Sequence, residues 1–315
     1  EILEKSKIPF KELYLVASKK SDGKKIKFRK KEIVIESLEN YDFSKAQITF
    51  FAAGREVAKN WAPKAAKKTI VIDNSSFFRM QKNVPLVVPE VNPEALDKHE
   101  NIIANPNCST MQMVLVLKPL HDEYKINRVV VSTYQAVSGA GKAPMDELIS
   151  QTKEYLDGNK VKSKNFTKQI AFNLIPHIDV FDKDGYTKEE LKMTNETKKI
   201  LDKEIEVSAT CVRVPVKTGH SESINIEFDN TYDFGTILDI LKNAPGCKVV
   251  DEHEDGGYIT PFEAEGDYIT YVSRIRKDNS NAKAINLWVV SDNLLKGAAL
   301  NTVQIAECLM KKMKL

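Results

Sequence analysis

The chain has 315 residues, of which 42% are hydrophobic and 29% charged, a balance that excludes a disordered or collagen-like protein. Its 47 Lys and Arg against 44 Asp and Glu leave a net charge of +3 spread along the chain, so we expect no nucleic-acid partner. No apolar run approaches the roughly 18 residues that cross a bilayer, and the four widely spaced Cys predict neither a metal site nor a disulfide framework. We expect a cytoplasmic, two-domain α/β protein without a signal peptide or membrane segment.

Short apolar strands alternate with helical stretches in the first third of the chain. The predicted strands are 13–17, 33–35, 48–52, 69–72 and 86–88, with a helix over 55–68. Strands that alternate with helices pair in parallel, which predicts a doubly wound sheet with ligands at the carboxyl ends of its strands. Polar turns follow three of these strands, at 18–21, 53–55 and 73–76.

Longer β segments characterise the rest of the chain. A helix over 111–124 comes first, and period-two alternation then predicts strands over 128–134, 211–216, 223–228, 268–275 and 284–290. Helices are predicted over 143–156 and 188–205, and one amphipathic helix over 293–312. This pattern indicates an α+β domain on a mostly antiparallel sheet. We expect a first domain of residues 1–110 plus 293–315 and a second of residues 111–292.

The segment Asn-Pro-Asn-Cys-Ser-Thr at 105–110 carries the strongest chemical signal. Cys108 lies at a predicted helix start, where the unpaired amides favour a thiolate. Ser109 and Thr110 can cap those amides, and Asn107 can donate a hydrogen bond to a developing oxyanion. From these residues alone, a nucleophile and a buried structural Cys are about equally supported.

A cysteine nucleophile needs a base, and His220 is the best candidate among five His. It is predicted in a Gly-containing turn between two strands, although a lone His in a turn is more often incidental. Arg213 precedes it by seven residues on the incoming strand, so both side chains can face one pocket. The other His lie in polar or apolar contexts without such partners: His99, His121, His177 and His253.

Three further segments suggest ligand contacts. The turn at 73–79 has hydroxyls, amides and Arg79 that suit phosphate, and a solvated turn is as well supported. Residues 187–190 match a capping box, and Glu189 and Lys192 lie three apart on one helical face, as in a surface ion pair. The Gly-rich turn at 138–142 brings backbone close to a ligand without matching a phosphate-loop or dinucleotide fingerprint.

Taken together, these segments resemble the aspartate-semialdehyde dehydrogenase family over essentially the whole chain. The resemblance rests on Asn-Cys-Ser at 107–109, Gln-Ala-Val-Ser-Gly-Ala-Gly at 135–141 and Gly-His-Ser-Glu at 219–222. It implies a Rossmann-like NADP-binding domain joined to a catalytic and dimerisation domain, assembled as a homodimer or a tetramer. It also implies an oxidoreductase of lysine (through diaminopimelate), threonine and methionine biosynthesis. The reaction would interconvert L-aspartate 4-semialdehyde plus phosphate and 4-phospho-L-aspartate through a cysteine thioester.

The resemblance assigns a role to each matching residue and implies no metal. Cys108 is the nucleophile, His220 the acid/base and Gln135 the residue that orients the substrate. The substrate and phosphate contacts are Arg213 for the carboxylate, Glu189 for the amino group, and Arg79, Lys192 and Asn107 for the phosphate. The NADP contacts are Ser18, Lys20 and Ser21 at the 2′-phosphate, and Ser138, Gly139 and Asn293 at the nicotinamide.

The sequence departs from the family at two places. Lys20 stands where many relatives have Arg. A lysine still favours NADP over NAD, but as a point charge rather than as a planar set of donors. The family pattern begins with a strand and a Gly-rich loop, whereas this sequence opens inside the following helix. A polypeptide that begins at Glu1 is therefore expected to bind NADP weakly and to lack the central strand of its sheet, and we expect the natural protein to have further residues.

Two rival functions remain at this point. An N-acetyl-glutamyl-phosphate reductase would perform similar chemistry on an acylated substrate, but Glu189 as a partner for a free amino group argues against it. A non-catalytic remnant retained for dimerisation would have no reason to keep Cys108, His220 and both anion sites together.

Overall fold

The computed structural model describes residues 1–313, which form two compact units. The first unit contains Glu1–Pro89, Pro93–Asn105 and the chain from Thr302 onward. The second contains Glu90–Asn92 and Pro106–Asn301. The division into functional domains at residues 110 and 293 remains a prediction.

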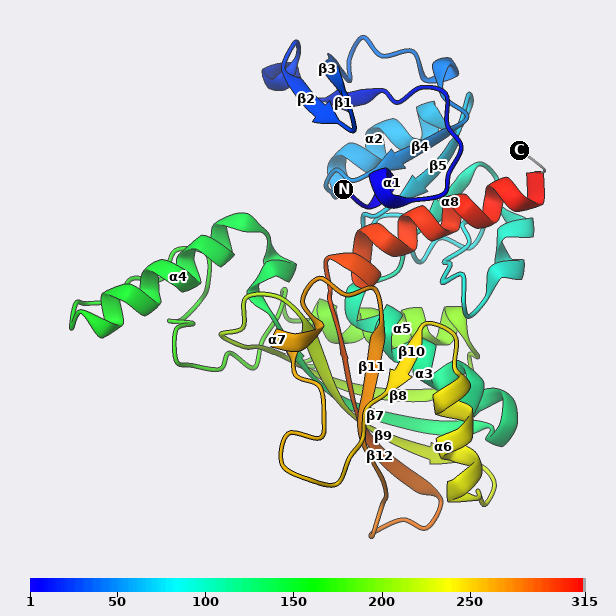
Figure 1. The fold of residues 1–315 in the computed structure, drawn as a ribbon, viewed down its shortest axis with the longest axis vertical. Helices are drawn as coiled ribbons and strands as arrows, with labels where there is room; N and C mark the ends of the chain where they lie inside the picture. Colours follow the sequence, from blue (N-terminus) through cyan, green and yellow to red (C-terminus); the bar gives the residue numbers. More distant parts are fainter. Residues whose placement is uncertain (314–315) are drawn as a thin grey trace. The chain divides into compact units, whose positions relative to one another are not determined.

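The strands of the first unit lie in two three-stranded sheets, ordered β1-β3-β2 and β4-β5-β6 (Figure 1). They are β1 (Leu15–Ala17), β2 (Lys25–Phe28), β3 (Lys31–Ser37), β4 (Ile48–Phe51), β5 (Ile70–Asp73) and β6 (Ile102–Ala104). The pairs β1–β3, β4–β5 and β5–β6 are parallel, as expected for strands joined by helical connections. The antiparallel hairpin of β2 and β3 was not predicted. The predicted strand at 86–88 is wrong, because only Leu86 forms a single bridge, to Ala104.

Helices cover the second of these sheets. These helices include α2 (Arg55–Ala65) and α8 (Leu300–Met313). α2 is three residues shorter than predicted. A further short helix, α1, spans Ile2–Lys5. Ile305 and Leu309 of α8 pack against Ile72 and Ile103 of the sheet in one apolar cluster. Short 3₁₀ turns complete the unit: η1 (Lys19–Ser21), η2 (Phe43–Lys45) and η3 (Pro93–Lys98).

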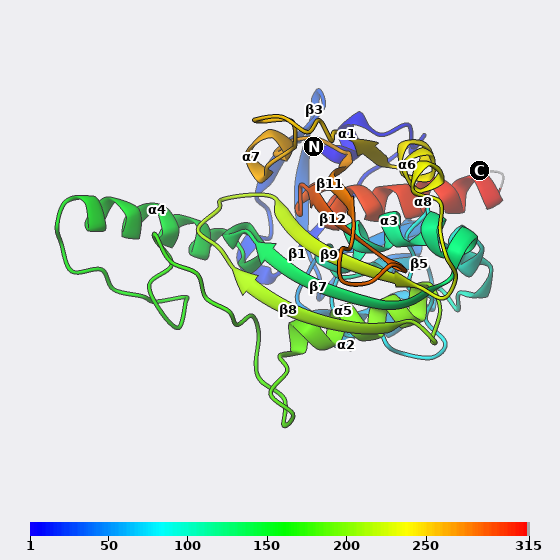
Figure 2. The same ribbon diagram turned by 90° about the horizontal axis from the view of Figure 1, so that it is seen from below.

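The second unit is built on a six-stranded sheet with the order β10-β11-β12-β9-β7-β8. Its strands are β7 (Ile126–Gln135), β8 (Glu206–Arg213), β9 (His220–Phe228), β10 (Cys247–Val249), β11 (Thr270–Lys277) and β12 (Ala284–Ser291). The inner pairs are antiparallel and the two outermost pairs parallel, which confirms the mostly antiparallel prediction. β8 ends at Arg213 rather than continuing to 216, since Pro215 has no N–H for the ladder. Figure 2 shows β7, β8 and β9 side by side.

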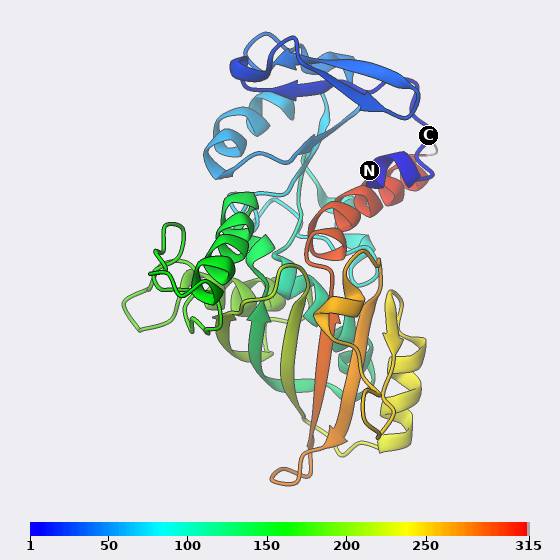
Figure 3. The same cartoon turned by 60° about the vertical axis from the view of Figure 1, so that its left-hand side comes forward.

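The helices of this unit are α3 (Cys108–Tyr124), α4 (Lys142–Leu156), α5 (Lys188–Ile200), α6 (Phe234–Asn243) and α7 (Pro261–Ala264). α3 buries Met113, Leu117 and Leu120 in the apolar core of the sheet. α6 lies beside β10 (Figure 3), and neither these two elements nor α7 was predicted. α5 ends five residues earlier than predicted, where the Asp202 side chain accepts from the Glu204 amide in a turn.

The predicted final helix is interrupted at its start. Leu295–Ala299 form a π-helical turn, with a bond from the Ala299 amide to the Leu294 carbonyl at 3.2 Å, and α8 begins only at Leu300. Lys296 in this turn is 1% exposed. Its ammonium contacts the Glu90 carboxylate at 2.6 Å and the Asn301 amide oxygen at 2.9 Å, which holds the turn in the core of the second unit.

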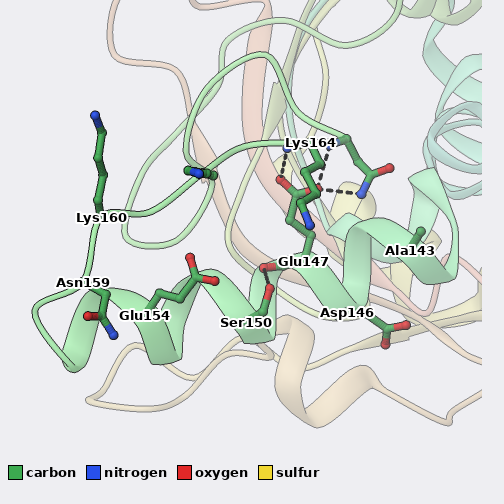
Figure 4. A pocket seen from close by; sticks show the side chains of 10 residues that line it. Ala143, Asp146, Glu147, Ser150, Glu154, Asn159, Lys160 and Lys164 are labelled. Carbon is green, nitrogen blue, oxygen red and sulfur yellow. Dashed lines mark hydrogen bonds between the residues drawn. The ribbon is translucent and has the colours of Figure 1, made fainter.

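α4 projects from the end of β7, and the following loop folds back along it (Figures 1 and 2). The Glu147 carboxylate accepts bonds from the Lys164 and Asn165 amides at 2.9 and 2.7 Å, which ties the loop to the helix (Figure 4). Between them lies an open cavity of about 630 Å³ with acidic and basic walls. Within residues 1–313, none of the helices is long and apolar enough to cross a membrane.

Candidate active site

Cys108 is the first residue of α3, and Asn107 is the residue that caps this helix. The Asn107 Oδ1 atom accepts bonds from the amides of Ser109 and Thr110, at 3.0 and 3.3 Å. The prediction that Ser109 and Thr110 cap the helix is therefore wrong, because both lie inside its buried first turn. Cys108 itself is partly exposed, at the amide end of a helix that favours a thiolate.

Asn107 is held by two glutamates of α5. Its Nδ2 atom donates to Glu189 Oε1 at 2.8 Å, and its backbone N–H donates to Glu196 Oε2 at 2.6 Å. The predicted donation from Asn107 to an oxyanion is therefore not the contact found here, since this amide faces Glu189. Sequence reasoning missed Glu196, although its spacing of seven from Glu189 puts both on one face of α5.

Glu189 begins a chain of ionic contacts at the start of α5. The predicted capping box is confirmed, with Thr187 and Glu190 bonded reciprocally. Lys192 Nζ lies 2.9 Å from Glu189 Oε2 and 2.8 Å from Asp179 Oδ2. Burial opposes ionisation of Glu189, but the Lys192 charge and hydrogen bonds from Lys192, Asn107 and Gln135 lower its pKa. Glu189 and Lys192 thus form an ionised, largely buried pair rather than a surface ion pair.

The two predicted phosphate cations lie in different units. Lys192 is in the second unit, with two carboxylates beside it. Arg79 is in the first, where its Nη2 atom donates to the Asn74 carbonyl at 3.1 Å. Their joint role in phosphate binding stays a prediction.

Gln135 and Arg213 face each other at the carboxyl ends of β7 and β8, where they are register partners. Gln135 Nε2 lies 3.3 Å from Glu189 Oε1. The Arg213 Nη1 atom donates to the Ala136 carbonyl at 2.6 Å. Burial lowers the pKa of Arg213, which the charge of Glu189 opposes.

His220 is fully buried and is the first residue of β9, not part of the preceding turn. Its Nδ1 atom accepts a bond from the Ala136 amide at 3.1 Å, whereas Nε2 has no partner within residues 1–313. Burial, together with the nearby Arg213 charge, lowers the pKa of His220 to about 3. The imidazole is therefore neutral over the physiological pH range.

Two glycines leave space at this site that a side chain would fill. A Cβ atom on Gly139 would lie 3.1 Å from His220 Nε2 and 3.2 Å from Arg213 Nη1. A Cβ atom on Gly297, in the π-helical turn, would lie only 2.8 Å from the Cys108 Cβ. Gly139 thus lies directly beside the His220 ring and the Arg213 guanidinium, and Gly297 packs against the cysteine.

Two other cysteines of the chain, Cys211 and Cys247, are poorly placed for nucleophilic chemistry. Burial raises the pKa of Cys211 far above its ordinary value, and that of Cys247 to about 12. A thiol with such a pKa is not ionised near neutral pH. In the part of the chain that the structure describes, no three His, Cys, Asp or Glu side chains gather to hold a metal ion.

The predicted cofactor residues occur in both units. In the second, Asn293 Oδ1 accepts from the Ser138 hydroxyl at 3.0 Å and from the Gly219 amide at 2.9 Å. This leaves the Asn293 NH₂ group with no hydrogen-bond partner among the described residues. In the first unit, Ser18, Lys20 and Ser21 form an accessible turn at the carboxyl end of β1.

Comparisons with known proteins give the family. Residues 1–99 match the model "Semialdehyde dehydrogenase, NAD binding domain", and residues 117–296 match "Semialdehyde dehydrogenase, dimerisation domain". Aspartate-semialdehyde dehydrogenase of Aquifex aeolicus is 51% identical over 318 residues, which cover 99% of this chain and 94% of that protein. The chain belongs to the aspartate-semialdehyde dehydrogenase family.

Solved structures of aspartate-semialdehyde dehydrogenases have the same fold. Enzyme II of Vibrio cholerae, crystallised in complex with ASA, is 46% identical with a TM-score of 0.95, covering 98% of this chain and 93% of that one. The Candida albicans enzyme with NADP is 26% identical with a TM-score of 0.77, covering 100% of this chain and 95% of that one. The predicted family is thus confirmed, and the chain is an oxidoreductase with a nicotinamide-dinucleotide-binding domain and a dimerisation domain.

Proposed function

We propose that this protein interconverts L-aspartate 4-semialdehyde plus phosphate and 4-phospho-L-aspartate, with NADP as cofactor, in lysine, threonine and methionine biosynthesis. The observation that carries the proposal is Cys108 at the start of α3, in the same unit as the buried Arg213 guanidinium, which borders the space left by Gly139 together with His220. Such a site pairs a nucleophilic sulfur with a receptor for a carboxylate. The names of the relatives support the same reaction.

The chemistry assigned to Cys108 has three steps. The thiolate attacks the aldehyde carbon, a C–S bond forms, and the carbonyl π pair moves to the oxygen. Loss of hydride from that carbon restores the C=O bond as a thioester. A phosphate oxygen then attacks the thioester carbon, and the C–S bond breaks to return the thiolate.

The substrate contacts follow from the charges around this sulfur. Arg213 offers a planar set of donors for the α-carboxylate. Glu189 is ionised and suits the α-ammonium group, with Gln135 beside it to fix the substrate. A free amino group therefore has an acidic partner, which favours aspartate semialdehyde over an N-acylated substrate. Arg79 and Lys192 are assigned to the phosphate, Lys192 with two carboxylates already on its ammonium.

The residues present fit a nicotinamide dinucleotide. Gly139 leaves room beside His220 that any side chain would fill, and the unpartnered NH₂ of Asn293 suits a carboxamide oxygen. Ser18, Lys20 and Ser21 offer hydroxyls and a cation at a strand end, which suits the 2′-phosphate of NADP. When bound, the cofactor takes up the hydride that leaves the substrate carbon.

We assign the protein a homodimeric state, or a tetramer built from such dimers, and a cytoplasmic location. α4 and the segment after its loop expose large apolar side chains: Tyr155 at 52%, Leu156 at 71%, Phe172 at 60% and Leu174 at 57%. This surface lies within the region that matches a dimerisation domain, so a second copy is its occupant. The four cysteines form no disulfide within residues 1–313, which suits a reducing compartment.

The test is a spectrophotometric assay of the purified protein with L-aspartate 4-semialdehyde. We expect NADPH to form only when semialdehyde, NADP and phosphate are all present, and more slowly with NAD. Cys108→Ala should lower the rate at least about a thousandfold, because the covalent step is lost, whereas Cys308→Ser should not. Phosphate-independent reduction of NADP, or full activity of Cys108→Ala, would overturn the proposal.

A further inference from the structure

The ammonium group of Lys296 lies at a place where a charge is costly. Lys296 is almost fully buried and Glu90 largely so, and their charged atoms lie 2.6 Å apart. Lys296 Nζ also donates to Asn301 Oδ1 at 2.9 Å. Two ions taken out of water lose hydration energy that a buried pair commonly does not return, and apolar residues of similar size are often at least as stable. The stability of the fold therefore does not by itself account for the pair.

The pair belongs to the π-helical turn at Leu295–Ala299. In this turn the Ala299 amide donates to the Leu294 carbonyl, five residues back instead of the four of a regular α-helix. A regular α-helix places side chains three and four residues apart beside each other. Lys296 and Asn301 are five residues apart, a spacing that the wider turn brings together. The bond between them therefore favours the π-helical turn over a regular helix.

Glu90 holds the same turn from outside the helix. It begins the short segment Glu90–Asn92, the part of the chain before residue 106 that lies in the second unit. Its carboxylate accepts from Lys296 Nζ, so one ammonium group joins this segment to Asn301 in the first turn of α8. Regular helical winding would rotate Lys296 away from at least one of these two partners.

The turn sets the place of the Cys108 side chain through Gly297. A Cβ atom on Gly297 would lie 2.8 Å from the Cys108 Cβ and 3.3 Å from its Cα, so only a glycine fits here without movement. Relaxation of the turn to a regular helix would shift the register by one residue and bring Lys296 or Ala298 toward the cysteine. Either side chain would displace Cys108 from its present position.

We propose that the Glu90–Lys296 pair positions the nucleophile: the pair fixes the π-helical turn, and the turn fixes Cys108 through Gly297. Neither charged side chain touches the substrate in this proposal, so both are positioning residues. Their effect on turnover rests on the proposed function, in which the Cys108 sulfur is the reacting atom. Loss of the pair lowers the reactivity of that sulfur and leaves substrate affinity nearly unchanged, since the substrate contacts lie on other elements.

The test replaces both ions at once, by Glu90→Met with Lys296→Met, which keeps two long side chains without charge. We expect the melting temperature to equal or exceed that of the wild type. Alkylation of Cys108 by iodoacetamide, followed by mass spectrometry of its peptide, should slow about fivefold or more. The value of kcat should fall about tenfold or more, with KM changed less than about twofold. Wild-type alkylation and kcat would overturn the proposal. A lower melting temperature would also overturn it, because the pair would then be a structural support.

Two further variants separate position from charge. Glu90→Gln removes the negative charge but keeps an oxygen that accepts from Lys296, so the alkylation rate should stay within about twofold of the wild type. A change as large as in the double variant would mean that the charge acts on the thiol directly, and would refute the positioning role. Lys312 and Asp97 form an exposed ion pair with the same 2.6 Å separation, and Lys312→Met should leave alkylation and kcat unchanged. Alkylation and melting are measured on the free protein, so their outcome stands whether or not the proposed reaction occurs.

Discussion

At the scale of a single residue, Arg213 combines an observed backbone contact with a proposed substrate contact. Its guanidinium suits a substrate carboxylate, and one of its nitrogens also donates to the Ala136 carbonyl at 2.6 Å. A lysine has one nitrogen on a flexible stem and cannot form the planar pair of bonds. Arg213→Lys should therefore raise KM for the semialdehyde about ten- to a hundredfold, the size of one or two charge-assisted hydrogen bonds.

Steady-state kinetics at saturating phosphate and NADP measure this change. His220→Asn is the comparison, because it should lower kcat with little change in KM. If Arg213→Lys lowers only kcat and leaves KM at the wild-type value, the guanidinium does not bind the substrate carboxylate.

Glu222 predicts an unusual pH dependence of stability. It is fully buried on β9, and burial raises its pKa well above 4.5, although a side-chain hydrogen bond with Gln112 acts in the opposite direction. The folded state therefore keeps a proton that the unfolded chain releases above pH 4.5. Stability from this proton is present below that pH and is lost as pH rises, by about 1.4 kcal/mol per pH unit while the folded carboxyl stays protonated.

Glu222→Gln keeps the shape of the protonated acid and removes the titration. We expect its melting temperature to exceed that of the wild type, by a margin that grows between pH 5 and pH 8 by about 2–4 °C per pH unit. Glu227→Gln, on the same strand but partly exposed, is the matched control and should show no such trend. A margin that is constant with pH would mean that Glu222 is ionised in the folded state.

Single residues were predictable from sequence where the signal is local. The Thr187 capping box depends on four consecutive residues and was correct. The capping residue of α3 was predicted wrongly, because residues 107–110 contain several side chains that can cap a helix. Which of them does so depends on where the helix begins. Glu196 was missed since its partner, Asn107, is 89 residues away in the chain.

The π-helical turn is the main surprise at the scale of elements. Its apolar positions continue the spacing of α8, so a single regular helix was the natural prediction. The wider turn is stabilised by contacts that sequence periodicity does not encode, namely Lys296 with Glu90 and Gly297 against Cys108. The β2–β3 hairpin was missed for a different reason, because its charged, exposed strand has little apolar alternation.

The π-helical turn at Leu295–Ala299 allows a prediction about Gly297. A methyl group there would lie 2.8 Å from the Cys108 Cβ, so one of the two must move. Displacement of a nucleophile by a fraction of an ångström lowers the rate strongly, and we expect Gly297→Ala to lower kcat about tenfold or more. The rate of Cys108 alkylation should change as well.

Leu294→Ala is the control for this substitution, since Leu294 adjoins the turn but is 43% exposed. It should leave both the alkylation rate and kcat near the wild-type values. Wild-type kinetics in Gly297→Ala would show that the turn does not position the cysteine.

At the scale of the whole molecule, the apolar surface of α4 and the segment after its loop predicts association. The Tyr155 and Phe172 rings contact each other with centroids 4.9 Å apart, and both remain more than half exposed. Exposed apolar area of this kind is a typical interface core. Phe172→Asp combined with Leu174→Asp should convert the proposed dimer to a monomer, because two charges would be buried without partners.

Light scattering after size-exclusion chromatography gives the mass of each species. Ile26→Asp, which also replaces an exposed apolar residue, lies on β2 outside this surface and should leave the mass unchanged. A dimer that survives the double substitution would place the interface elsewhere.

The fold of the second unit was predicted better than that of the first. Its central strands are long and alternate regularly, so five of the six could be located from sequence, and β10 is only three residues long. In the first unit the parallel pairings were correct, but their division between two sheets depends on spatial neighbours. Local patterns specify strands, whereas sheet membership is a property of the whole unit.

The Ala136 peptide has a consequence for redesign of the enzyme. One main-chain unit accepts from Arg213 through its carbonyl and donates to His220 through its amide. Exchange of Arg213 for a residue that recognises a different acid group would also withdraw the donor from that carbonyl and loosen the amide that orients the imidazole. Under the proposed function, substrate preference and turnover are thus coupled through the C=O and N–H of the Ala136 peptide, which a side-chain substitution cannot replace. A successful change of substrate will need a new side chain that still supplies a donor to the Ala136 oxygen.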